Sequence, residues 1–177
     1  MVFNQMKTTQ YSFKKLSQSD VTDAYVSWLN NPEINQFLEV RHIKQNKKTV
    51  QEYINSYYQE EERYIWGIYD GTTLVGTTTL SEINYKTLSA EIGLMIGDAN
   101  YWGKLASDSA CQFVFKFSFN DLYLETITGG CKDNNIGMVF TFKKLGFVRS
   151  DIRGLGKENL GHEWILTKKK WLEKNDK

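Results

Sequence analysis

The sequence contains few of the residues that mark linkers, disulfide frameworks or histidine-based sites. It has one proline (Pro32), two cysteines and two histidines in 177 residues. With a single proline, the chain has no Pro-rich linker or low-complexity tract. Cys111 and Cys131 show no CxxC spacing and no histidine partner pattern, so we expect two buried free thiols in a reducing cytoplasm.

An excess of one charge and long apolar runs are also missing. The formal net charge of +1 gives no electrostatic signature for nucleic acid or an acidic membrane. The most apolar stretch, Phe113 to Phe119, is short and interrupted by Lys116, whereas a bilayer span needs about 20 apolar residues. The first ten residues lack the apolar segment of a signal peptide. We therefore expect a cytoplasmic protein without a nucleic-acid or membrane partner.

What the chain does have is the composition of one folded domain. Hydrophobic residues make up 41% and aromatic residues 14% of the sequence, which argues against disorder. A length of 177 residues suits one domain with a proper core and is short for two. The sequence contains no internal repeat. We expect a single domain over residues 1–177.

Periodicity and capping residues predict the elements of the first half. They are a strand at 11–16, a helix capped by Ser19 or Asp20, a short helix beginning at Pro32, a loop over 39–48, and a helix from Thr49 with an apolar stripe formed by Val50, Tyr53, Ile54 and Tyr57. Asp70 and Gly71 then predict a hairpin between strands at 64–69 and 73–83.

The second half reads as strand, glycine turn, helix, strand and helix. The expected elements are a strand at 90–96, a turn at 97–103, a helix at 104–119, a strand at 124–131, a helix from Asn135 to Leu145, and strands at 148–155 and 162–167. A βαβα unit of this kind usually carries parallel strands. Following a hairpin, it predicts an α+β fold with a mixed central sheet flanked by helices.

Two features of the second half suggest chemistry. Glu91 is a carboxylate within an apolar strand, where burial is costly without a partner or a task; alternatively it touches water at the sheet edge. The turn before the second-half helix has Gly103 and Lys104, and free N–H groups at a helix start can bind phosphate. A single glycine before a helix is more often an ordinary turn, and Asn135 is equally an ordinary N-cap.

The order of these features resembles the GNAT superfamily of N-acetyltransferases, and within it the RimJ/RimL branch of ribosomal-protein N-terminal acetyltransferases. The segments that carry the resemblance are Ala90 to Gly93, Tyr101 to Lys104, Asn135, Lys144 to Phe147, and Trp28 to Asn35. It extends over roughly residues 11–166.

The resemblance implies acetyl-CoA as donor, a primary amine as acceptor, and no metal. It assigns Glu91 as the general base that deprotonates the amine, usually through water. It assigns the acetyl-CoA site to Leu94, Met95, Ile96, Trp102, Gly103, Lys104, Leu105, Ala106, Ser107, Asn135 and Phe142. It places the acceptor near Trp28, Glu39, Arg41 and His42, although Trp28 also fits a core position and Arg41 a solvated one. His42 and His162 are interpreted as structural or exposed.

Three positions depart from the family pattern. Leu105 replaces the second glycine of the turn, Met138 replaces a common serine, and Phe142 replaces the tyrosine that often protonates the leaving thiolate. A catalytically degenerate acyl-CoA-binding module is therefore a competing interpretation.

The sequence leaves two classes of acceptor amine to consider. A looser resemblance to enzymes that acetylate nucleotide-linked amino sugars favours a small-molecule amine. A protein N-terminus is the alternative, with Glu33 and Glu39 as possible acidic lining. The sequence leaves monomer and homodimer open.

Overall fold

The structure is a computed structural model that describes residues 10–59, 62–153 and 161–175. The chain divides into two compact units. Unit 1 contains the residues up to Thr79 together with Leu94–Phe113, and unit 2 contains Leu80–Gly93 together with the residues from Val114 onward. Each is described by itself.

Unit 1 is built from two whole strands, the first part of a third, the end of a fourth, and a set of helices. Its elements are β1 (Tyr11–Lys15), η1 (Gln18–Asp20), α1 (Asp23–Asn30), α2 (Pro32–Asn35), η2 (Glu39–His42), α3 (Lys47–Gln59), β2 (Tyr64–Asp70) and η3 (Ala99–Tyr101). β3 (Thr73–Asn84), β4 (Ser89–Ile96) and α4 (Ala106–Lys116) contribute residues to both units.

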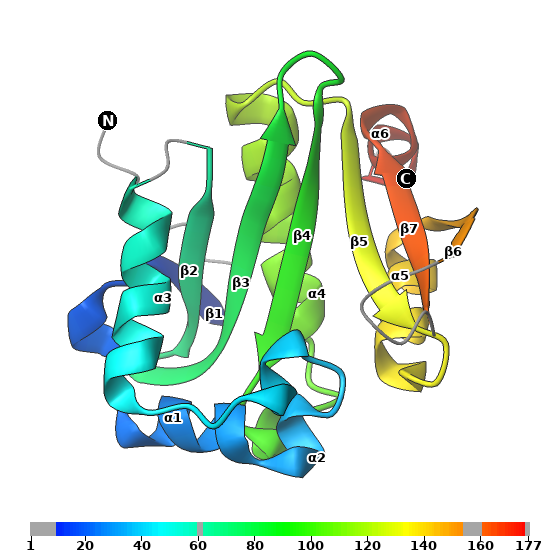
Figure 1. The fold of residues 1–177 in the computed structure, drawn as a ribbon. Helices are drawn as coiled ribbons and strands as arrows, with labels where there is room; N and C mark the ends of the chain where they lie inside the picture. Colours follow the sequence, from blue (N-terminus) through cyan, green and yellow to red (C-terminus); the bar gives the residue numbers. More distant parts are fainter. Residues whose placement is uncertain (1–9, 60–61, 154–160, 176–177) are drawn as a thin grey trace. The chain divides into compact units, whose positions relative to one another are not determined.

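The core of unit 1 lies between the helices and the strands. β1 pairs antiparallel with β2, and α3 runs alongside β2 (Figure 1). The buried cluster draws on α1, α3, β2, the end of β4 and the connections on either side of η1, and consists of Leu16, Val21, Tyr25, Trp28, Val50, Ile54, Tyr57, Ile65 and Met95. The α1 and α3 residues recur at the three- and four-residue spacing of a helix face.

Unit 2 contains the rest of the strands and the C-terminal helices. Its remaining elements are the π-helical turn η4 (Phe117–Asp121), β5 (Thr126–Lys132), α5 (Ile136–Leu145), β6 (Val148–Arg153), β7 (Gly161–Thr167) and α6 (Lys168–Asn175). α5 ends at Gly146, whose φ of 96° is the left-handed conformation that glycine adopts readily. The aromatic pair Phe142–Trp164 packs α5 against β7, and the pair Phe119–Trp171 packs η4 against α6. Figure 1 shows α5 and α6 beside β5 and β7.

The strand pairing of unit 2 is uneven. β4 pairs in parallel with β5 over Ser89–Glu91 and Thr126–Thr128. Among the described residues of this unit the parallel register ends there, whereas β5 continues antiparallel to β7 as far as Lys132. The point where the β4–β5 register ends is therefore marked by Glu91 and Thr128.

The seven strands follow the order β1-β2-β3-β4-β5-β7-β6. The predicted mixed sheet and the α+β class are confirmed. Seven predicted strands and the main helices are present, and both cysteines are buried and free, as expected.

Several boundaries differ from the prediction, for local reasons. The N-cap of α1 is Thr22, not Ser19 or Asp20, because Asp20 instead accepts a hydrogen bond from the Ser17 N–H at 2.7 Å and closes η1. The predicted loop over 39–48 contains η2 and the first turn of α3. Tyr53 of the predicted α3 stripe is 45% exposed, and its hydroxyl bonds the Tyr57 hydroxyl at 2.9 Å.

The second half differs in a similar way. The helix predicted over 104–119 is α-helical only over Ala106–Lys116 and widens into the π turn. The predicted strand end at Leu155 and the connecting glycines 154 and 156 lie outside the described residues. No helix in the described ranges combines the length and apolarity needed to cross a membrane.

Candidate functional site

The end of β4 in unit 1 is fixed by two tryptophans. The indole N–H of Trp102 donates to the Ile96 carbonyl at 2.9 Å, while the ring stays 47% exposed. Gly97 lies against Trp28, since a Cβ on Gly97 would be 2.1 Å from the Trp28 ring. Because Trp28 is only 8% exposed, it supports the strand end from inside the core.

The turn before α4 has the backbone that a phosphate site needs. Gly103 has a φ of 73° and no atom within 4 Å of where its Cβ would be, so a ligand could come close to the backbone there. Leu105 also has a positive φ, 23°, and is 60% exposed. The turn thus has a positive φ at the position where the resemblance noted above expects glycine, even though the residue here is leucine.

The other residues of this turn are held in place by unit 1. The Lys104 carbonyl accepts from the Tyr11 hydroxyl at 3.2 Å, and its ammonium lies 5.5 Å from the Tyr101 ring centroid. The first turn of α4 begins with Ala106, whose N–H donates to the Lys104 carbonyl, and Ser107, whose N–H has no acceptor within the helix. Glycine, lysine and helix-start amides together fit an anionic phosphate.

The helical segment around η2 contains the residues predicted to contact the acceptor. Arg41 is engaged locally, with a guanidinium N–H donating to the Leu38 carbonyl at 2.8 Å and a 3.6 Å ion pair to Glu39. Glu39 and His42 are exposed. These three residues are neighbours on one 3-10 turn.

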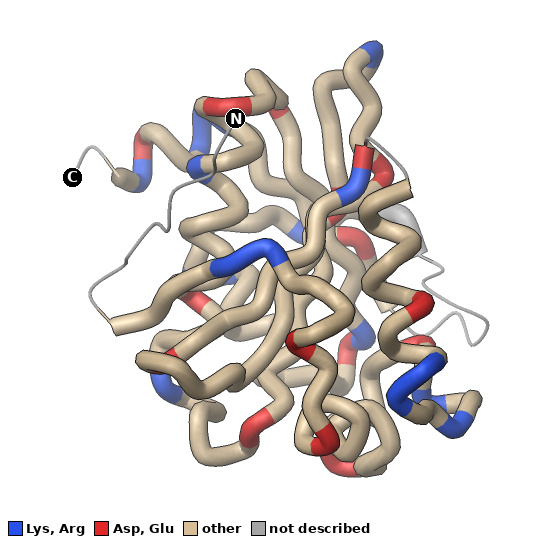
Figure 2. The backbone as a smooth tube through the Cα atoms, turned by 90° about the vertical axis from the view of Figure 1, so that its left-hand side faces the viewer, with Lys and Arg blue, Asp and Glu red and all other residues tan. Residues whose placement is uncertain are grey.

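In unit 2, Glu91 has unusual surroundings. Glu91 is an exposed residue, yet partial desolvation by neighbouring atoms raises its pKa, and the charges of Glu82 and Glu163 raise it further. Figure 2 shows where acidic and basic residues lie along the backbone. A carboxylate surrounded in this way holds a proton more tightly than an ordinary glutamate.

Glu82 and Glu163 were not among the residues predicted for the site. Alternation along the predicted strand at 162–167 puts Glu163 on the face opposite Trp164, and that signal could have indicated it. Glu82 has a φ of 51°, which departs from strand geometry, so alternation could not have indicated it.

Phe142 occupies the space above β5. A Cβ on Gly129 would lie 2.7 Å from the tip carbon of the Phe142 ring and 3.3 Å from an Ile92 methyl. The ring is 1% exposed. Its tip therefore reaches the residues that directly follow Glu91 and Thr128, where the β4–β5 register ends.

Asn135 is the N-cap of α5, with its side-chain oxygen accepting from the Met138 N–H at 3.1 Å. That bond uses the oxygen and leaves the amide –NH₂ as the group that would donate to a ligand. Met95 is buried in the unit 1 core, and Leu94 is partly buried. Within the described ranges, no three His, Cys, Asp or Glu side chains gather as a metal site.

Comparison with known proteins identifies the family. The sequence profile described as "Acetyltransferase (GNAT) domain" matches residues 12–148, so the chain belongs to the GNAT acetyltransferases. The enzyme class predicted from the sequence is confirmed at this level.

Individual relatives are more distant. An uncharacterized protein of Methanocaldococcus jannaschii is 28% identical over 172 residues, covering 89% of this chain and 33% of that protein; the chain thus spans about a third of the length of that relative. A crystal structure named "Probable acetyltransferase" has a TM-score of 0.79 and 20% identity, covering 95% of this chain and 99% of that one. Spermidine N-acetyltransferase from Vibrio cholerae, solved with CoA and spermine, has a TM-score of 0.78 and 21% identity, covering 93% and 99%. At such identities the solved structures show a shared fold.

Proposed function

We propose that this chain transfers an acetyl group from acetyl-CoA to a primary amine, with Glu91 as the general base. The observation that carries the proposal is the position and environment of Glu91. It stands at the last paired residue of β4 and β5, and its pKa is raised by burial and by Glu82 and Glu163. A base works best when its pKa approaches the working pH.

The chemistry follows from these groups. The amine reaches the protein largely as an ammonium ion, and Glu91 removes one proton, directly or through a water molecule. The nitrogen lone pair then forms a bond to the thioester carbonyl carbon, and the carbon–sulfur bond breaks. Acetyl-CoA supplies the activated acyl group. Because Phe142 has no acidic proton, the departing thiolate takes its proton from water, and the hydroxide that remains removes the second proton from the acylated nitrogen to give the neutral amide.

The candidate coenzyme contacts are the turn before α4, the main chain at the end of β4, and the N-cap of α5. In unit 1 the turn from Trp102 to Ser107 would hold the pyrophosphate through N–H groups and Lys104. The main chain of Leu94 and Met95 would pair with the pantetheine arm, since Trp102 already occupies the Ile96 carbonyl. The family resemblance also makes the side-chain amide of Asn135 a candidate donor to the pantetheine.

The surroundings of Glu91 support a cationic acceptor. Glu82, Glu91 and Glu163 would attract an amine with several positive charges and repel the diphosphate of a nucleotide-linked sugar. Arg41, the residue best suited to a diphosphate, is engaged with Leu38 and Glu39. We therefore place a small polyamine ahead of the amino-sugar nucleotide. The Vibrio cholerae relative, whose name gives spermidine as its substrate, is consistent with this order.

The resemblance to the RimJ/RimL branch makes a protein N-terminus the next acceptor. Glu39, Arg41 and His42 remain our candidates for acceptor contacts, whereas the resemblance alone supports Trp28, whose indole lies in the unit 1 core. We place the reaction in the cytoplasm, since two buried free cysteines suit a reducing compartment.

The test is amine-dependent release of CoA from acetyl-CoA. Spermidine, an amino-sugar nucleotide and an N-terminal peptide are compared at equal concentration. We expect release with spermidine above the other two. No release with any of them, combined with a rise in Tm on adding acetyl-CoA, would identify a binding module and contradict the enzyme proposal.

A further inference from the structure

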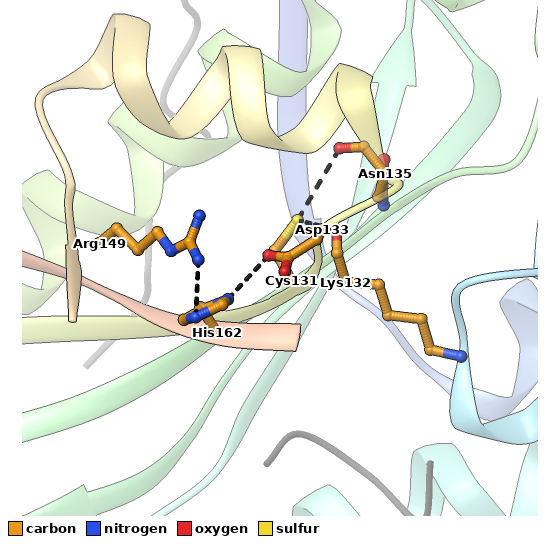
Figure 3. Close-up of polar contacts among 6 residues, drawn as sticks. All are labelled: Cys131, Lys132, Asp133, Asn135, Arg149 and His162. Atoms are coloured by element: carbon orange, nitrogen blue, oxygen red, sulfur yellow. Dashed lines mark hydrogen bonds and ion pairs between the residues drawn. The ribbon is translucent and has the colours of Figure 1, made fainter. Parts of the chain in front are cut away.

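A buried histidine in unit 2 joins three segments of chain. His162 lies on β7 and is 4% exposed. Its Nδ1 is 2.8 Å from the Asp133 carboxylate, in the turn between β5 and α5, and its Nε2 is 2.7 Å from the Arg149 guanidinium on β6. Figure 3 shows the imidazole between the other two side chains, with one dashed line to Arg149 and one to Asp133.

The two partners determine which nitrogen carries the proton. A guanidinium can only donate hydrogen bonds, so the Nε2 of His162 must accept from Arg149. The proton is then on Nδ1, which donates to the Asp133 carboxylate. Both ring nitrogens are engaged, so this arrangement gives His162 no role as a proton carrier for a substrate.

A cysteine–histidine pair is also excluded here. Cys131 is directly opposite His162 in the β5–β7 register, but its Sγ donates to the Lys132 carbonyl at 3.2 Å and lies 3.9 Å from the Asn135 carbonyl (Figure 3). Burial also raises the pKa of this thiol to about 11, which disfavours the reactive thiolate.

The hydrogen bond between His162 and Asp133 constrains the turn between β5 and α5. This turn is closed by the Asn135 N–H donating to the Lys132 carbonyl at 3.0 Å, and its last residue is Asn135, the N-cap of α5. Asp133 is two residues before Asn135 and is tied through His162 to β7 and β6. The position of the turn is therefore coupled to two strands that carry none of the proposed coenzyme contacts.

We propose that Asp133, His162 and Arg149 are positioning residues that hold the Asn135 amide in place for the pantetheine arm of acetyl-CoA. The proposal rests on the proposed function. It predicts that residues without contact to the coenzyme affect its affinity through Asn135. Asp133 has a 55% exposed side chain, so its replacement removes the link without emptying the core.

The experiment measures the Kd for acetyl-CoA by calorimetry on the full chain. For D133A we expect about a tenfold weaker Kd, which corresponds to about 1.4 kcal/mol. For D133N we expect a Kd within about twofold of wild type, because the amide oxygen still accepts from His162. Asn134 is exposed in the same turn, and N134A, the matched control, should bind as wild type does.

A double-mutant cycle separates positioning from general destabilisation. If Asp133 acts through Asn135, then D133A should weaken binding little further in an N135A background. R149M tests the far end of the chain of contacts and should also weaken the Kd, by roughly threefold to tenfold. The Tm of each variant confirms that it is folded.

The outcomes distinguish the two proposals. If the wild-type chain binds acetyl-CoA and D133A binds it with the same Kd, the positioning role alone is overturned. The same holds if D133A and N135A weaken binding independently of each other. No binding by the wild-type chain would overturn the proposed function and this inference with it.

Discussion

Replacing Gly97 by alanine should destabilise this protein more than any ordinary glycine substitution. The new Cβ would lie 2.1 Å from both Cδ2 and Cε3 of the Trp28 indole, whereas non-bonded carbons prefer about 3.5–4 Å. One of the two groups must therefore move by more than an ångström. Trp28 is 8% exposed and its ring centroid is 5.9 Å from that of Tyr25, so the indole has little free space.

Overpacking of this kind costs about 1–3 kcal/mol, and a clash with a buried indole belongs at the upper end. For a protein of this size, about 3 kcal/mol lowers the Tm by roughly 6–12 °C. The assay is thermal unfolding followed by circular dichroism, with wild type and variant at the same concentration. The matched control is G137A in α5, where nothing lies within 4 Å of the added Cβ.

Alanine is favoured over glycine in a helix by up to about 1 kcal/mol, so G137A should melt at or slightly above the wild-type temperature. A G97A protein that melts within about 2 °C of wild type would refute the packing of Trp28 beneath the end of β4.

Three further predictions follow from individual side chains. Because the pKa of Glu91 is raised above its ordinary value of 4.5, Glu91 stabilises the fold below that value and loses this contribution as the pH rises through its folded pKa. E91Q should therefore have a higher Tm than wild type at pH 7–8, with the difference vanishing near pH 4; an equal Tm at both pH values would contradict this. F142Y adds a hydroxyl at the ring tip beside Gly129 and should raise kcat by up to about tenfold by protonating the thiolate, while F142L should not; stopped-flow CoA release would show whether the two variants differ. Burial raises the pKa of Cys131 to about 11 and raises that of Cys111 as well, so native protein at pH 8 should react with a maleimide far more slowly than unfolded protein, and rapid labelling of either thiol in the native state would be inconsistent with the structure.

Much of the fold could be predicted from the sequence because its signals are local. The hairpin at Asp70 and Gly71, the glycine stop at Gly146 and the helix start at Pro32 all depend on conformations that few residues favour. The cap of α1 could not be predicted in the same way. Ser19, Asp20 and Thr22 are all good caps, and the choice depends on the Ser17–Asp20 contact that forms η1.

In the candidate site, too, local signals could be predicted from the sequence and long-range contacts could not. Glu91, Gly103 and Asn135 are indicated by residue type and order along the chain. Long-range contacts are not: the contact of Asp133 with His162 joins residues 29 positions apart, and Glu163 affects Glu91 only because strand order brings β4, β5 and β7 together. The positive φ of Leu105 could not be predicted either, since the sequence there has lost the glycine that would indicate it.

The most direct test of the account is the effect of E91Q on turnover. With acetyl-CoA saturating and spermidine varied, kcat/KM for CoA release should fall about 10²–10⁴-fold in E91Q, while the Kd for acetyl-CoA stays within about twofold of wild type. A kcat/KM within a few-fold of wild type would contradict the assignment of Glu91 as the general base.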